Sequence, residues 1–192
     1  MVKGVGPIQP YKKEPEYKRS LGIEFYSEEI LKMFLISQKI PTNIQEKKDI
    51  EKISKNLSML TWIGQLGIVS KKDEKKVVDE LRDLKDNFHL DTVFKKTSYI
   101  LQNIKNINRK TQIMEHVIDI SYEIGKQKNV IPQNILELQK YFDQIMDKVK
   151  VVSDKFAIMK LERDLQDIKK IYLNNPKEIS LLLQNLEKIS KL

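Results

Sequence analysis

Residues 132–172 read PQNILELQKYFDQIMDKVKVVSDKFAIMKLERDLQDIKKIY, and they carry the longest helical periodicity in the chain. Apolar side chains recur at heptad spacing from Leu138 to Met159, and the stripe then shifts to a register that runs from Leu161 to Tyr172, as at a stutter in a coiled coil. The pattern predicts one very long helix of about 40 residues, which at 1.5 Å per residue is roughly 60 Å long. Such a helix needs packing partners beyond a compact core, and partner subunits are the simplest source.

The chain from Ser27 onward shows the same helical periodicity. Alternating β-branched runs flanked by hairpin turns are absent from the sequence, so it predicts an all-α, multi-helix domain that resembles a four-helix bundle. Residues 91–125 predict either two helices or one bent helix. The expected helix caps or first turns are Ser27, Thr42, Ser70, Asp91 and Pro132. The expected ends or kinks are Ile40, Gly64, Gly67, Gly125 and Asn175.

The first 26 residues differ in character from the rest. Three of the six prolines, three of the six glycines and five cations fall within the first 22 residues. Prolines keep such a segment extended. Its aromatic and aliphatic residues favour an arm that docks on something over a purely solvated terminus. The sequence therefore predicts a basic N-terminal arm over residues 1–26 and a helical domain over residues 27–192.

The positive charge is concentrated toward the front of the chain. The net charge is +8, and residues 1–110 hold 22 Lys and Arg against 15 Asp and Glu, whereas residues 111–192 hold 13 against 12. An excess of cations favours a polyanionic partner, with nucleic acid first and an anionic membrane second. The alternative is that the charge only aids solubility.

Residues suited to catalysis or metal binding are sparse. The chain has no cysteine, and His89 and His116 lie far apart without the spacing of a metal site. No phosphate-binding glycine loop is present in the sequence, and the acidic residues alternate with lysines as on solvated helix faces. We expect no enzyme activity, no cofactor and no metal.

The start, MVKGVGP, lacks an apolar core, so we expect no signal peptide, and the apolar stretches are too short to span a bilayer. These features predict a protein of the cytoplasm, or of a particle assembled there.

An extended basic arm leading into a cysteine-free helical bundle resembles the major capsid proteins of filamentous archaeal viruses, with the lipothrixviruses nearer and the rudiviruses next. The start MVKGVGP, the cations of the arm and the helices from Ser27 onward carry this resemblance. It implies a coat subunit of a virion, assembled in the host cytoplasm. Such a subunit pairs with itself or with a paralogous subunit, stacks into a helical polymer and wraps linear double-stranded DNA without sequence preference. The resemblance also implies contact with neighbouring subunits or a viral envelope.

Carried onto this chain, the resemblance implies contacts between cations and the DNA backbone. The arm supplies the first group, two lysines seven apart extend it along the first helix, and four lysines form a second basic face. These candidate DNA-binding residues are Lys3, Lys12, Lys13, Lys18, Arg19, Lys32, Lys39, Lys47, Lys48, Lys52 and Lys55.

Two other functions remain open from the sequence. The first is a helical adaptor or scaffold whose arm binds a protein partner. The second is a DNA-binding regulator that uses residues 57–84 as a helix-turn-helix, with a Gly in the turn and Ser70 as the cap. Asp73 stands where that motif expects an apolar residue, so a plain helical hairpin competes with it.

Overall fold

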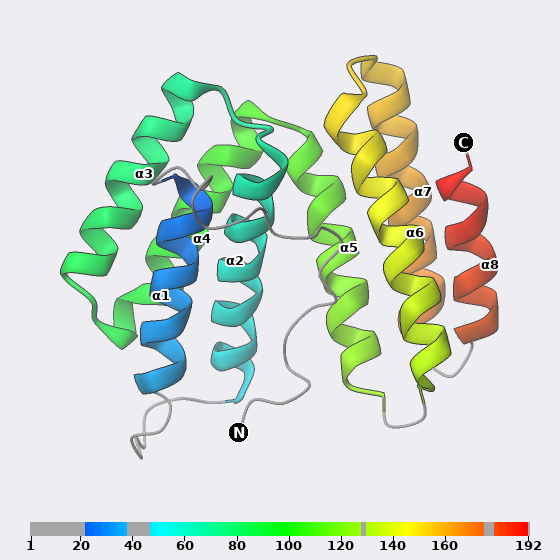
Figure 1. Ribbon diagram of the computed structural model, residues 1–192, viewed down its shortest axis with the longest axis horizontal. Coiled ribbons are helices and arrows are strands. Elements are labelled where there is room, and N and C mark those ends of the chain that lie inside the picture. Colours follow the sequence, from blue (N-terminus) through cyan, green and yellow to red (C-terminus); the bar gives the residue numbers. More distant parts are fainter. Residues whose placement is uncertain (1–21, 38–46, 128–129, 175–178, 192) are drawn as a thin grey trace. The chain divides into compact units, whose positions relative to one another are not determined.

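The computed structural model describes residues 22–37, 47–127, 130–174 and 179–191, which form helices and no strand (Figure 1). The predicted all-α, multi-helix fold is confirmed for these residues. The helices are α1 (Ile23–Ser37), α2 (Lys47–Leu66), α3 (Lys71–Asp86), α4 (Leu90–Ile107), α5 (Lys110–Gly125), α6 (Pro132–Val151), α7 (Lys155–Asn174) and α8 (Ile179–Ser190).

Helices α1 to α4 form the first of two compact units. Helix α1 packs against α2 and α3, and α4 packs against the same two helices, so the four helices close a ring around one core. The largest fully buried side chains include Phe34, Leu57, Trp62 and Leu81. Burial of these apolar side chains is the main source of stability for amphipathic helices of this length.

Gly64 sets the closest approach in the first unit. It lies inside α2, and a Cβ atom at this position would meet the backbone of Glu24 in α1, 2.5 Å from its nitrogen and 2.9 Å from its Cα. Only glycine leaves room for two helix backbones at that distance. The sequence predicted a stop or kink at Gly64. The helix instead continues to Leu66, and the residue serves helix packing.

Helices α5 to α8 form the second unit. Helix α5 packs against α6 and α7, and α8 packs against the same two helices. The core includes Phe142, Leu165, Tyr172 and Leu186. The order of packing repeats that of the first unit, because in each unit the first and fourth helices both contact the second and third. Two four-helix units with the same set of packed helix pairs thus follow each other along the described chain.

The predicted single long helix is wrong, because the structure divides it into α6 and α7. Val152 is extended, with ψ of 131°, and the backbone N–H of Ala157 donates to Asp154 Oδ2 at 3.1 Å, as at a helix N-cap. The chain reverses at this point (Figure 1). Helix α7 can then bury Leu165 and Tyr172 inside its own unit, which a continuous 60 Å helix would not allow.

Two expected caps are also wrong. Helix α1 begins at Ile23, so Ser27 lies inside it and is buried, because packing of Ile23 and Tyr26 outweighs the capping preference. Helix α4 begins at Leu90, which places Asp91 in its first turn.

Other predicted helix boundaries are confirmed. Ser70 caps α3 by accepting from the backbone N–H of Asp73, and Pro132 stands in the first turn of α6. Residues 90–125 form two helices, because Asn108 is extended and its side-chain amide donates to the Ile68 carbonyl at 2.6 Å. The expected cap at Thr42 and the expected ends at Ile40 and Asn175 lie outside the described residues.

Candidate nucleic-acid interface

The predicted DNA-binding residues divide into three groups by what the structure describes. The first group lies outside the described residues and consists of Lys3, Lys12, Lys13, Lys18, Arg19 and Lys39. The second group, Lys47 and Lys48, lies in the first turn of α2, where only the backbone is described. The third group, Lys32, Lys52 and Lys55, has described side chains.

Lys32 projects from α1 into solvent. Its Nζ donates to Glu29 Oε1 at 3.2 Å, one helical turn earlier, and its side chain is 67% exposed. An exposed pair of this kind contributes little to stability, on the order of 0.3 kcal/mol. Lys32 can therefore exchange Glu29 for a stronger anion such as a phosphate at small cost.

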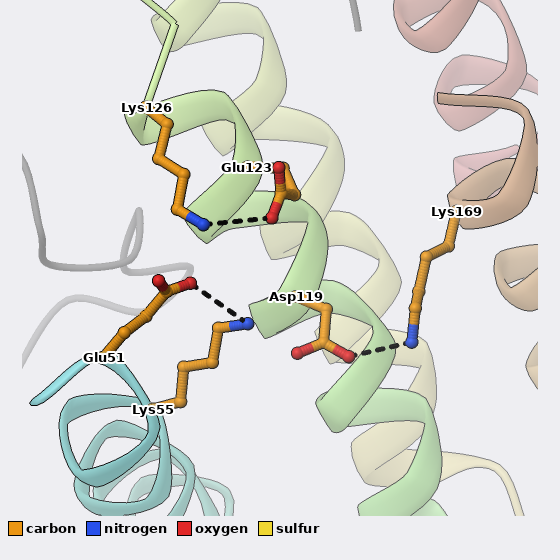
Figure 2. Close-up of polar contacts among 6 residues, drawn as sticks. All are labelled: Glu51, Lys55, Asp119, Glu123, Lys126 and Lys169. Carbon is orange, nitrogen blue, oxygen red and sulfur yellow. Dashed lines mark hydrogen bonds and ion pairs between the residues drawn. The ribbon is translucent and has the colours of Figure 1, made fainter. Parts of the chain in front are cut away.

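Lys52 and Lys55 are held more closely by their own unit. The Lys52 ammonium lies over the Phe94 ring of α4, 5.6 Å from the ring centroid. Lys55 is half-buried and lies 3.6 Å from Glu51 Oε1, as Figure 2 shows. Any phosphate contact by these two lysines would compete with interactions already made within the unit.

The end of α1 nearest the arm is fixed by aromatic rings and cations. Arg82 donates to the Tyr26 hydroxyl at 3.2 Å, and the hydrogen bond to this hydroxyl is the main factor that raises the pKa of the Arg82 guanidinium. Lys85 lies 5.8 Å from the Phe25 ring centroid and 5.9 Å from that of Tyr26. Both rings were expected in the arm, but they belong to α1 and pack against side chains of α3.

The structure adds a basic surface that the candidate residues did not include. Lys71, Lys72, Lys75 and Lys76 occupy the first half of α3, and all four are exposed. The run KKDEKK was visible in the sequence as a signal, but the candidate residues were chosen from the arm and the first two predicted helices. The positive end of the α3 dipole adds to the potential of these lysines.

The second unit holds a polar cluster between α5 and α7. Lys169 donates to Asp119 Oδ2 at 2.8 Å, as Figure 2 shows. The Lys169 ammonium also lies 3.5 Å from His116 Nδ1. The side chains of Lys169 and Asp119 are each about one quarter exposed. This geometry links two helices that pack together, as a partly shielded ion pair does.

The segment considered as a helix-turn-helix has the expected turn. Gly67 adopts φ of +61°, in the left-handed region that favours glycine, and Ser70 caps α3. Helix α3 packs mainly against α1 and α4, and α2 packs mainly against the same two helices. The α2–α3 pair is therefore part of a four-helix ring.

Within the described ranges, no group of three His, Cys, Asp or Glu residues could hold a metal ion. None of the described helices is both long and apolar enough to cross a membrane. Comparisons with protein-family models, with curated proteins and with solved structures find no match to this chain.

Proposed function

We propose that this chain is a structural DNA-binding protein that coats linear double-stranded DNA by contacting the phosphate backbone. The observation that carries the proposal is the charge distribution, because residues 1–110 hold a net +7 of the total +8. Phosphate contacts require cations within reach and no fixed three-dimensional site, so a basic arm on a helical scaffold suits them. The exposed lysines of α3 and Lys32 offer further contacts on the same half of the chain.

The proposal extends to the particle that such a subunit would build. The resemblance stated above supports a coat protein of a filamentous virion, assembled in the host cytoplasm from copies of this chain or with a paralogous subunit. Stacked helical units would face neighbouring subunits or an envelope, and the arms would follow the duplex. DNA would be bound by its shape and charge, without base contacts.

The test is a salt titration of binding to double-stranded DNA by fluorescence anisotropy. The full chain is compared with a variant in which Lys3, Lys12, Lys13, Lys18 and Arg19 are changed to Gln. A matched control changes five exposed cations of the second unit to Gln, namely Lys126, Lys140, Arg163, Lys170 and Lys188.

We expect the salt dependence of the arm variant to be less steep, with the magnitude of the slope of log K against log salt reduced by about 4.5. The five changed cations would each lose one phosphate contact, and each contact contributes about 0.9. The control should change the slope by less than about 1. Equal loss in both variants would show that net charge alone drives binding. Failure of the full chain to bind at low salt would favour the adaptor whose arm binds a protein. The titration is repeated with two duplexes of unrelated sequence. Much tighter binding to one of them would favour the helix-turn-helix regulator.

A further inference from the structure

The turn between α6 and α7 exposes an unusual amount of apolar surface. Residues 150–160 read KVVSDKFAIMK, and the exposed fractions of Val151, Phe156 and Met159 are 77%, 79% and 37%. We call these three residues the apolar tip. Phe156 to Met159 are four consecutive apolar residues near the start of α7, directly after Lys155. Soluble proteins rarely leave such a cluster in water unless it binds something.

The apolar tip is framed by positive charge. Lys150 and Lys155 are exposed on either side of the turn, and Lys160 is exposed one turn further along α7. Asp154, the acidic residue of the segment, accepts the Ala157 backbone N–H as a helix cap, and Lys160 donates to Asp164 at 3.2 Å. A partner for the tip must therefore offer apolar contact surrounded by a negative or neutral rim.

The first unit contains a groove of matching character between α3 and α4. Its volume is about 300 Å³, and buried Val77, Ile100 and Ile104 form its floor. Ile107 lines the same groove and is 53% exposed. The rim carries Asp73, Lys76 and Glu80 on α3 and Asn103 and Asn106 on α4. The charged residues that line the groove therefore sum to −1, because Lys71, Lys72 and Lys75 of the α3 basic surface do not line it, whereas residues 150–160 sum to +2.

We propose that the apolar tip of one copy inserts into the α3–α4 groove of a second copy. The inference rests on the proposed function, because it names the contact by which coat subunits would polymerise. A tip-to-tip contact would bring the lysines of two copies together, whereas a tip-to-groove contact places them beside Asp73 and Glu80. Such a contact joins two different surfaces, so each copy keeps one free tip and one free groove and the assembly can grow.

The first test measures self-association by sedimentation velocity without DNA. The full chain should form species larger than a monomer as its concentration rises from about 1 to about 200 µM, a span that covers weak contacts of Kd near 10 µM. Phe156→Ser removes the most exposed ring of the tip, and Ile107→Lys places a cation in the groove. Each should weaken association at least tenfold. Leu136→Ser, which removes an apolar side chain that is 66% exposed elsewhere on α6, should leave it unchanged.

Mixing the two variants distinguishes a tip-to-groove contact from a contact in which both copies use the same surface. The Phe156→Ser chain keeps its groove, and the Ile107→Lys chain keeps its tip, so an equimolar mixture should form dimers and nothing larger. Circular dichroism checks that both variants remain helical. If Ile107→Lys fails to fold, Glu80→Lys at the exposed rim takes its place.

Four outcomes would overturn the inference. The first three are a full chain that stays monomeric throughout the range, variants that associate as well as the full chain, and a mixture that stays monomeric. The fourth is that Phe156→Ser reduces binding of the chain to vesicles that contain phosphatidylserine and leaves self-association unchanged. DNA binding is measured separately in the salt titration. A full chain that stays monomeric but binds DNA as expected would sink this contact alone. A full chain that self-associates as expected but fails to bind DNA would sink the proposed function alone.

Discussion

At the scale of single residues, stability depends on positions that the apolar pattern does not reveal. Gly64 has a helical neighbour so close that a side chain would collide with backbone atoms of Glu24. Asp143 has one carboxylate oxygen that is buried without a hydrogen-bond partner. Both features arise from tertiary packing, and both lead to measurable predictions.

Gly64→Ala should destabilise the protein by about 2 kcal/mol, the cost of forcing packed elements apart, even though Ala favours the helix by about 1 kcal/mol. The measurement is the midpoint of urea unfolding. Gly67→Ala is the contrasting variant, since open space surrounds that position and only its positive φ resists a side chain. It should cost about 1 kcal/mol. A Gly64→Ala protein as stable as the parent would contradict the close α1–α2 packing.

Asp143 should make stability depend on pH. Burial, and secondly the charge of Asp147, raises the pKa of Asp143 from 3.8 to about 6. A carboxyl whose pKa is higher in the folded state binds protons more readily there, so lowering the pH from about 7 toward 4 favours folding at this site. Asp143→Asn should increase the free energy of unfolding at pH 7.5 by about 1 kcal/mol, allowing for solvent screening, and should reduce the gain on acidification. Urea unfolding of parent and variant at pH 7.5 and pH 5 measures both effects. If the stability of the two proteins depends equally on pH, a group other than Asp143 causes that dependence.

At the scale of helices, local chemistry could be predicted from the sequence better than packing. Ser70 and Pro132 mark helix starts through side-chain and ring chemistry that acts within one turn, and both were predicted correctly. The heptad spacing across Val152 and Phe156 suggested continuity, yet these residues flank a reversal, and Phe156 is exposed. A repeat of apolar residues does not show which helix, if any, will pack against them.

The α6–α7 reversal depends on Asp154. Asp154→Ala should lose the bond from the Ala157 backbone N–H and cost about 1 kcal/mol, as is typical for an N-cap. Asp154→Asn or Asp154→Ser should retain most of the stability, because either side chain can accept the same bond. Thermal unfolding of the three variants makes the comparison. A rise in helical circular dichroism in Asp154→Ala, with no loss of stability, would mean that α6 and α7 join into one helix and that the cap is not needed.

At the scale of the whole molecule, the sequence predicted the helical class and showed where the positive charge lies, but it did not predict the division into two four-helix units. That division depends on which helices share a core, a long-range property that periodicity does not encode. Part of the candidate interface followed directly, because charge runs are visible in sequence. The sequence could not show that Lys52 lies over Phe94 or that Lys55 pairs with Glu51. It also could not show the groove between α3 and α4, because that groove forms only when the helices pack.

If the chain coats DNA, electron microscopy of the full chain with linear double-stranded DNA should show the coated duplexes. Two duplexes of unrelated sequence, one twice as long as the other, are mixed with excess protein at low salt. We expect filaments of uniform width whose lengths follow the twofold ratio of the duplexes, whereas assemblies formed without DNA should have no such fixed lengths. Discrete particles at fixed positions on the DNA, or bare DNA beside free protein, would contradict the proposed coating of DNA.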